Sequence, residues 1–432
     1  MMKTMTTSIF AFLLLFTSFG CKKEPVTPVI PVPVDTPAYQ TKLDIKWIQW
    51  YDTDTVGAYM LDPMFFGDYV AFCTRSLASE KKGSLGFGIF NRTNGERHPV
   101  WDHFFPDLVT GTSDDIPDWR LCGQNGDIAV LTTRNRLFAW DLSSGQMLWQ
   151  HNHAPYFGLH KLSSVGSVPY HSFQNGINSI WNRLARFDPV TGIKEDLVTI
   201  PKLDNVEARI YPVSASVSPA NGDTILLFVT GGISSNTNIE RIDAYAFNQT
   251  TRTMHWQVYD IMQNRHAAIY PPLVVGDKVV FQGASSIHCF DISSGALLWE
   301  HLYDRWAKGF MENLYGDGKV FVRNGTSVQA YDLHTGAELW ETKNRMNLQM
   351  GGAMGFYQGK VYFTATDDTH PYYAKSLFCI DANTGAVIWK DPGPSKNGGL
   401  TFGIIIDQST GYLYATDAFR MMCIDLNNTP KP

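Results

Sequence analysis

Residues 137–149 read LFAWDLSSGQMLW, and three further stretches repeat this pattern without a gap. They are 287–299 (IHCFDISSGALLW), 328–340 (VQAYDLHTGAELW) and 377–389 (LFCIDANTGAVIW). Each contains an apolar run, an aspartate, a short turn with a glycine, and a tryptophan eight residues after the aspartate. Self-similarity of this kind indicates a repeat architecture.

The chain carries eight copies of the marker aspartate or asparagine, some of them in degenerate surroundings. The eight positions are Asn91, Asp141, Asp188, Asn248, Asp291, Asp332, Asp381 and Asp425. Consecutive markers stand about 40–60 residues apart, and a unit of this size holds the four short strands of a propeller blade. The repeat therefore predicts an all-β, eight-bladed β-propeller with four-stranded antiparallel blades.

The residue types of the repeat follow from the geometry of a tight hairpin. The aspartate side chain accepts hydrogen bonds from backbone amides of the turn, and the glycine supplies the positive φ that completes it. The tryptophans share one phase of the strand alternation, so we expect them to pack between adjacent blades. These structural roles fall on Asp141, Gly145, Trp149, Asp291, Gly295, Trp299, Asp332, Gly336, Trp340, Asp381, Gly385 and Trp389.

The last repeat lacks its outer strand, because the chain ends soon after Asp425. Residues 43–50 (LDIKWIQW), at the other end of the chain, have the pattern of an outer strand without a preceding hairpin. We therefore expect residues 42–51 to complete the last blade and close the ring, which removes the open sheet edges.

The first twenty residues have the pattern of an export signal. Lys3 precedes an apolar run at 9–16 that is too short to span a bilayer. Small residues then precede Cys21, and this cysteine resembles the lipobox cysteine of bacterial lipoproteins, which is acylated after cleavage. The resemblance implies a signal peptide at 1–20 and a lipid anchor at Cys21. An ordinary cleaved signal with an incidental cysteine is the alternative.

Residues 22–40 contain five prolines, which predict an extended tether of about 50 Å. The expected organisation is a signal peptide (1–20), a lipidated cysteine with a proline-rich tether (21–41) and the propeller (42–432). Lys22 is not the aspartate that retains lipoproteins in the inner membrane, which favours the outer membrane. Whether the propeller faces the periplasm or the cell surface stays open.

Composition excludes some partners. The net charge is −6, and no basic cluster occurs beyond the short Lys81-Lys82 pair, so we expect no nucleic-acid ligand.

The five cysteines after Cys21 are odd in number and widely spaced, which is typical neither of a disulfide framework nor of a zinc site. Cys289, Cys379 and Cys423 stand two residues before a marker, where other copies have alanine, so we interpret them as packing residues.

The signature A-[IWYF]-D-x-x-[ST]-G-x-x-x-W, often with cysteine at its first position, resembles the PQQ-like (quinoprotein-like) repeat. That repeat occurs in quinoprotein dehydrogenases and in the lipoprotein subunit of the outer-membrane β-barrel assembly machinery, and here the resemblance covers about residues 42–427. The WD40 repeat fits less well, since Asp141 is the one marker that follows a tryptophan and no Gly-His opens the units.

The resemblance leaves three classes of function open. The dehydrogenases of the family carry a vicinal cysteine pair and a calcium ion held by Glu, Asn and Asp, but no two cysteines are adjacent here. We therefore expect a non-enzymatic envelope lipoprotein without cofactor or metal, a monomeric propeller that binds envelope proteins or a glycan through its face. The alternatives are a carbohydrate-binding or carbohydrate-processing surface protein and a quinone-dependent dehydrogenase.

Local constellations give weaker hypotheses. The pair His151 and His153 could hold a metal ion, and Asp114-Asp115 and Asp367-Asp368 could hold calcium, although a polar strand end and solvated turns explain them better. A ligand is most expected at the mouth of the central channel, which the inner strands line. The candidates there are Arg120, Lys161, Arg209, His266, Glu312 and Gln349, unless they only solvate the channel.

Overall fold

A computed structural model describes residues 41–50, 58–60, 62–76, 85–100, 104–105, 118–132, 136–152, 162–173, 182–201, 207–233, 239–262, 270–283, 286–303, 313–324, 327–342, 352–366, 375–394, 403–417 and 420–430. They belong to one compact unit, Tyr39–Pro432. The regular secondary structure of these residues consists of β-strands. None of them forms a helix that could cross a membrane.

The first four blades contain strands that follow one another in chain order. Blade 1 contains β2 (Ala58–Met60), β3 (Met64–Phe66), β4 (Tyr69–Ser76), β5 (Leu85–Asn91) and β6 (Phe104–Phe105). Blade 2 contains β7 (Asp118–Cys122), β8 (Ile128–Thr132), β9 (Arg136–Asp141) and β10 (Gln146–Asn152). Blade 3 contains β11 (Ser163–Val165), β12 (Val168–Phe173), β13 (Arg183–Phe187) and β14 (Lys194–Thr199). Blade 4 contains β15 (Glu207–Ile210), β16 (Ser214–Val217), β17 (Thr224–Ile233), β18 (Ile239–Asn248) and β19 (Thr253–Met262).

The last four blades keep this order except for the strand that closes the ring. Blade 5 contains β20 (Leu273–Val275), β21 (Lys278–Gln282), β22 (Ser286–Asp291) and β23 (Leu297–Leu302). Blade 6 contains β24 (Leu314–Gly316), β25 (Lys319–Asn324), β26 (Ser327–Asp332) and β27 (Glu338–Glu341). Blade 7 contains β28 (Gly355–Tyr357), β29 (Lys360–Thr366), β30 (Lys375–Asp381) and β31 (Val387–Asp391). Blade 8 contains β32 (Ile404–Asp407), β33 (Tyr412–Thr416), β34 (Arg420–Asp425) and β1 (Ile45–Trp50).

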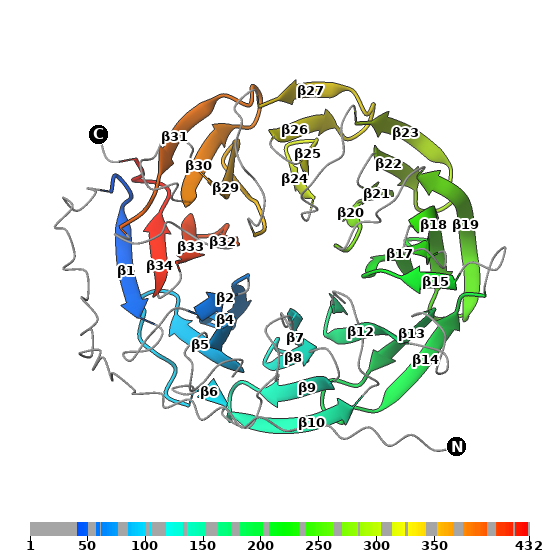
Figure 1. Cartoon of the computed structure of the whole chain (residues 1–432), viewed down its shortest axis with the longest axis horizontal. Helices are drawn as coiled ribbons and strands as arrows, with labels where there is room; N and C mark the ends of the chain where they lie inside the picture. Colours follow the sequence, from blue (N-terminus) through cyan, green and yellow to red (C-terminus); the bar gives the residue numbers. More distant parts are fainter. Residues whose placement is uncertain are drawn as a thin grey trace, which may run out of the picture. The chain divides into compact units, whose positions relative to one another are not determined.

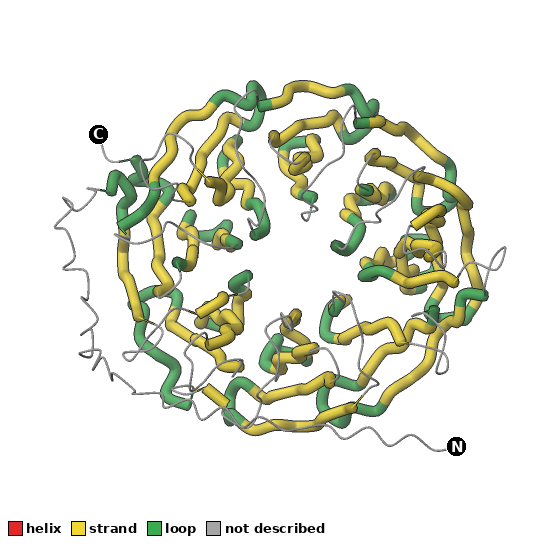
Figure 2. The backbone as a smooth tube through the Cα atoms, in the orientation of Figure 1, coloured by secondary structure: helices red, strands yellow, loops and turns green. Residues whose placement is uncertain are grey.

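The eight sheets follow one another around a ring, with the first strand of each sheet innermost (Figures 1 and 2). Neighbouring strands pair antiparallel throughout, which confirms the predicted eight-bladed propeller. In blades 1 and 4 the innermost strand is split in two, into β2 and β3 and into β15 and β16. Pro63 and Pro212 lie at these two breaks, and proline has no amide hydrogen to donate to a ladder.

The marker aspartate builds the turn between the third and fourth strands. Asp332 Oδ1 accepts hydrogen bonds from the amides of His334 (3.0 Å) and Thr335 (2.8 Å). The Gly336 amide donates to the Asp332 carbonyl at 2.9 Å, and Gly336 has a φ of 70°. The amide and hydroxyl hydrogen bonds from Thr335 hold the pKa of Asp332 below its usual value. Equivalent turns form at Asn91, Asp141, Asp188, Asn248 and Asp381.

The tryptophan of the preceding blade packs against this turn. Trp299 Nε1 donates to the Leu333 carbonyl at 2.8 Å, and a Cβ on Gly336 would come within 2.5 Å of the indole. Glycine is therefore required here for two reasons: its φ is positive, and the Trp299 indole leaves no room for a Cβ atom. Four more indoles donate across blade boundaries in this way: Trp47 to Arg92, Trp149 to Pro189, Trp256 to Ile292, and Trp340 to Ala382.

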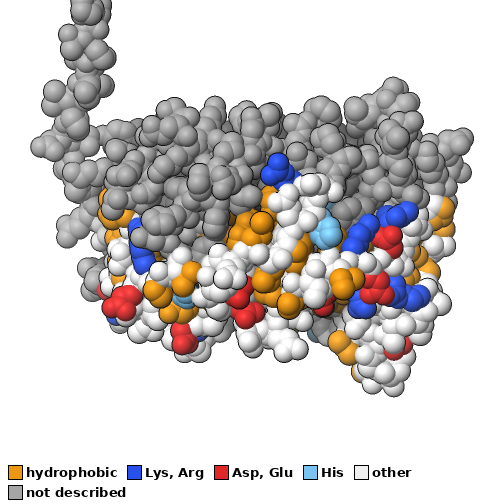
Figure 3. Space-filling model, turned by 90° about the horizontal axis from the view of Figure 1, so that it is seen from below, with side chains coloured by type: hydrophobic (Ala, Val, Ile, Leu, Met, Phe, Trp, Pro, Cys, Tyr) orange, Lys and Arg blue, Asp and Glu red, His pale blue; other side chains and the backbone are white. Residues whose placement is uncertain are grey.

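The boundary between blades 3 and 4 replaces this indole contact with ion pairs. Arg252 stands where the other turns have glycine, has a φ of 60°, and pairs with Glu195 of blade 3. Glu195 also pairs with Arg186, and Asp196 pairs with Arg183 at 3.0 Å. Charged side chains of both signs gather on this side of the molecule, at the right of Figure 3. Blade 3 thus departs from the repeat because its outer strand has no tryptophan.

The N-terminal strand β1 completes blade 8, which confirms the predicted ring closure. The Asp425 amide donates to the Asp44 carbonyl at 2.8 Å, as the Asp332 amide donates to Ala337 at 2.9 Å within a covalent hairpin. Trp47 follows Asp44 by the same three residues by which Trp340 follows Ala337. The closing strand therefore takes the register of a hairpin strand although no hairpin joins it to β34.

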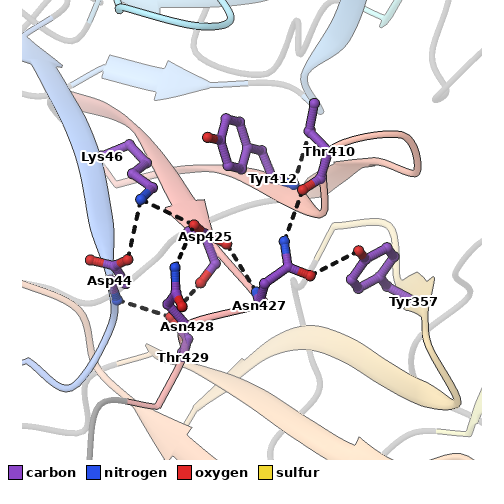
Figure 4. Close-up of polar contacts among 9 residues, drawn as sticks. All are labelled: Asp44, Lys46, Tyr357, Thr410, Tyr412, Asp425, Asn427, Asn428 and Thr429. Atoms are coloured by element: carbon purple, nitrogen blue, oxygen red, sulfur yellow. Dashed lines mark hydrogen bonds and ion pairs between the residues drawn. The ribbon is translucent and has the colours of Figure 1, made fainter.

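A polar network holds the two chain ends together (Figure 4). Lys46 Nζ lies 3.1 Å from an Asp425 carboxylate oxygen and 3.4 Å from Asp44. Thr429 Oγ1 accepts from the Asp44 amide at 2.9 Å and donates to the Asp425 carbonyl at 2.8 Å. Asn427 extends this network to blade 7, because its Oδ1 accepts from the Tyr357 hydroxyl at 3.0 Å.

A buried carboxylate holds the chain just before the closing strand. Asp391, at the end of β31, is 1% exposed. It accepts hydrogen bonds from the Thr41 hydroxyl at 2.9 Å, the Lys42 amide at 2.8 Å and the Gly393 amide at 2.7 Å. The chain therefore joins the propeller at the outer strand of blade 7.

Replacing Trp299 by alanine should lower the free energy of unfolding by about 3–5 kcal/mol, since the indole is buried and its contacts with Gly336 and Leu333 are lost. Trp50→Ala is the matched control, because that indole is 53% exposed. Urea unfolding followed by tryptophan fluorescence measures both variants. Equal losses for the two would contradict the packing role of Trp299.

Candidate functional site

A cavity of about 870 Å³ lies inside the ring. Its wall is made by the innermost strands of all eight blades or by the residues that lead into them. We call this cavity the channel. A concave site that combines apolar surface with a few polar groups is the usual form of a ligand site in proteins.

One part of the channel wall carries large aromatic and apolar side chains among polar ones. Phe65, Tyr315, Phe356 and Ile405 line the channel from blades 1, 6, 7 and 8, which are consecutive around the ring. We call these four side chains the aromatic arc. Close packing supports the arc, because a Cβ on Gly316 would lie 2.4 Å from the Phe356 ring of the next blade. The glycine thus lets the innermost strands of blades 6 and 7 approach each other.

The rest of the wall combines hydrogen-bonding side chains with Leu121 and Val213. Arg120, Ser164 and Ser214 line the channel from blades 2, 3 and 4. The Arg120 guanidinium donates to the Trp119 carbonyl at 2.7 Å, which holds it in the wall on β7. The channel therefore offers an apolar surface and hydrogen-bonding groups to the same ligand.

The residues proposed from the sequence for the channel mouth are distributed as follows. Arg120 lines the channel. Arg209 lies on β15, beside Tyr211, while Val213 and Ser214 form the channel wall of blade 4. The other four candidates lie outside the described residues: Lys161, His266, Glu312 and Gln349.

Sequence reasoning missed the aromatic arc. Its members occupy the middle position of three-residue strands, as in MFF (Met64–Phe66), LYG (Leu314–Gly316) and GFY (Gly355–Tyr357), or the second position of β32. An aromatic residue two positions before the first residue of the hairpin turn was the signal that could have found three of them, Phe65, Tyr315 and Phe356.

The five cysteines of the described residues are free and buried. Burial raises the pKa of the Cys289 thiol to about 12 and that of Cys379 to about 11, so both stay protonated at neutral pH. They pack within the blades, opposite Trp299 and Trp389 of the outer strands.

Of the histidines and aspartates considered as metal ligands, the structure describes His151. His151 Nε2 lies 2.7 Å from the Gly192 carbonyl, and its ring contacts Trp149 and Phe187 between blades 2 and 3. His153, Asp114-Asp115 and Asp367-Asp368 lie outside the described residues. Within the part of the chain that the structure describes, no three His, Cys, Asp or Glu side chains are grouped as metal ligands.

Comparison with protein families decides the type of repeat. A sequence model of the family described as "Outer membrane protein assembly factor BamB" matches residues 240–428. The chain is a PQQ-like repeat β-propeller. The matched part of this PQQ-like propeller holds three of the four strongest repeats and every blade from 5 to 8, whereas divergent blade 3 lies outside it. A search of curated proteins finds no match.

Solved structures share the fold of the PQQ-like propeller at low sequence identity. The computationally designed Ika8 protein aligns with a TM-score of 0.56 at 14% identity, over 86% of this chain and 98% of that one. BamB from Moraxella catarrhalis aligns with a TM-score of 0.53 at 15% identity, over 88% and 100%. A europium-containing methanol dehydrogenase aligns with a TM-score of 0.59 at 12% identity, over 87% and 84%.

The described wall of the channel does not fit the quinone and calcium of the dehydrogenases. The described wall contains two carboxylates, Asp62 on blade 1 and Asp317 on blade 6, and calcium takes six to eight oxygen ligands. All five described cysteines are buried outside that wall, and no two of them are adjacent in the chain. These residues therefore supply neither the vicinal pair nor the ligand set that the resemblance implies.

Proposed function

We propose that the chain is an envelope lipoprotein whose propeller acts as a binding or scaffold module, and that its partner binds in the channel. The observation that carries the proposal is the mixed channel wall, in which aromatic and hydrogen-bonding side chains line one cavity. The aromatic arc on blades 6, 7, 8 and 1 faces polar groups on blades 2, 3 and 4. Such a wall buries apolar surface of a partner while its polar groups fix the orientation.

The rest of the chain suits this role. Five interblade indole contacts and a closed ring make a firm support for the channel. Asp391 holds the chain at Thr41, directly after the proline-rich segment that follows Cys21. A lipid on Cys21 would then keep the propeller at the outer membrane, within reach of envelope proteins and glycans.

Photo-crosslinking tests the proposal. Benzophenone-phenylalanine replaces Tyr315 in the channel wall, or Leu302 on the outer strand of blade 5 as the control. Leu302 is 67% exposed, so it is at least as accessible as Tyr315 at 40%. Because benzophenone reacts with C–H bonds of proteins and glycans alike, irradiated envelopes should give a discrete adduct from position 315 alone. Adducts from position 302 alone would reject the channel as the binding site.

A further inference from the structure

A small side pocket opens beside the channel between blades 4, 5 and 6. It holds about 10 Å³, close to the space of one water molecule. Tyr270, Pro271 and Asn313 line both the pocket and the channel, so the two are continuous in their walls. Gln282, at the end of β21, forms part of the inner wall of the pocket.

Two buried amide oxygens in this pocket have no hydrogen-bond partner, Gln282 Oε1 and Asn313 Oδ1. Gln282 is 4% exposed, and its Nε2 donates to the Arg323 carbonyl at 3.1 Å. That bond fixes which end of the Gln282 amide is nitrogen, so the oxygen is left for another donor. Unpaired buried acceptors are rare in folded proteins, so a donor of the size of a water molecule, either water or a ligand group that displaces it, is expected here.

The side chains that line the pocket favour a neutral donor. The Arg323 side chain is fully buried, and its guanidinium donates to the Gly352 carbonyl at 3.0 Å and the Thr364 carbonyl at 2.8 Å. These bonds tie the guanidinium to blade 7, and Arg323 does not line the pocket. No charged side chain lines the described wall of the pocket, so a buried ion there would have no partner of opposite charge.

The size of the pocket selects among neutral donors. A hydroxyl oxygen is as small as a water molecule, whereas a peptide N–H carries a carbon on either side of its nitrogen. A hydroxyl both donates and accepts: it can donate to Gln282 Oε1 and accept from the Asn313 amide once that amide is turned by 180°. A hydroxyl group therefore satisfies both side chains.

We propose that this pocket is a hydroxyl-binding subsite and that the channel takes a neutral carbohydrate. Asn313 lies two residues before Tyr315 of the aromatic arc, so the subsite and the arc meet on blade 6. One hydroxyl of the sugar enters the pocket, and the C–H face of a sugar ring packs on the arc. The inference rests on the proposed function of the channel and adds its ligand class.

Isothermal titration calorimetry tests the inference on the full mature chain with Cys21→Ser. The probes are four neutral oligosaccharides: maltohexaose, cellohexaose, xylohexaose and mannohexaose. We expect at least one to bind, and we expect Gln282→Leu and Asn313→Leu each to weaken that binding by about tenfold. Gln150→Leu, on the exposed face of the outer strand of blade 2, is the control and leaves binding unchanged.

Asn313→Leu keeps the test valid if the buried Gln282→Leu variant does not fold, because Asn313 Oδ1 has no partner to lose. The inference is overturned if none of the four oligosaccharides binds, or if binding is equal in wild type and Asn313→Leu. A protein adduct from position 315 without saccharide binding would keep the channel as the binding site and reject the carbohydrate. If position 315 gives no adduct and no oligosaccharide binds, the proposed function is rejected as well.

Discussion

Deleting residues 42–51 is expected to lower the melting temperature by more than about 10 °C or to make the protein aggregate. The deletion removes β1, exposes the edge of β34 and empties the site of Trp47, which is 8% exposed. The indole alone contributes about 4–6 kcal/mol of hydrophobic burial. Circular dichroism and light scattering during heating measure the two outcomes.

The matched control deletes residues 22–31, ten residues of the expected tether, and should leave the melting temperature unchanged. Trp47→Ala tests the indole separately, since it keeps the backbone pairing of β1 with β34 and loses the contact with Gly95. An unchanged melting temperature after deletion of 42–51 would show that β1 does not hold the ring closed.

Replacing Cys21 by serine is expected to move the protein from the membrane fraction to the soluble fraction. Acyl chains contribute about 0.8 kcal/mol for each buried CH₂ group, so two or more chains make the attachment stable. Fractionation together with palmitate labelling of both proteins measures the change. The melting temperature of the released propeller should equal that of the wild type.

Cys122→Ser is the control for this substitution, because Cys122 is buried and burial raises its pKa to about 12. This variant should keep both the label and the membrane fraction. A wild-type protein that takes up no label and is already soluble would refute the lipid anchor, while the propeller would be unaffected.

The fold could be predicted from the sequence because four blades carry a complete local turn pattern and the other four carry parts of it. An aspartate, a glycine four residues later and a tryptophan eight residues later specify one hairpin and one interblade contact. Ring closure could be predicted as well, since residues 43–50 carry the outer-strand pattern that the last repeat lacks. Blade 3 was harder, because Arg186 stands at the small site before its marker and pairs with Glu195.

The channel wall could be predicted only in part. The inner strands are short and carry no marker, so the residues that line the channel depend on where each strand starts. Arg120 lines the channel, as predicted. In blade 4 the innermost strand breaks at Pro212, so Val213 and Ser214 line the channel, while Arg209 lies on β15 before the break. The side pocket joins Gln282 with Asn313, which belong to different blades, so no local pattern could reveal it.

Blocking the channel tests the central claim most directly. Ser164→Trp places an indole in the channel wall of blade 3, opposite the aromatic arc, in the anchored protein that carries benzophenone-phenylalanine at position 315. Ser143→Trp, on an exposed turn of blade 2, adds the same side chain outside the channel. If the channel is the binding site, Ser164→Trp abolishes the crosslinked adduct and Ser143→Trp preserves it. An adduct that survives Ser164→Trp at full yield would contradict the account.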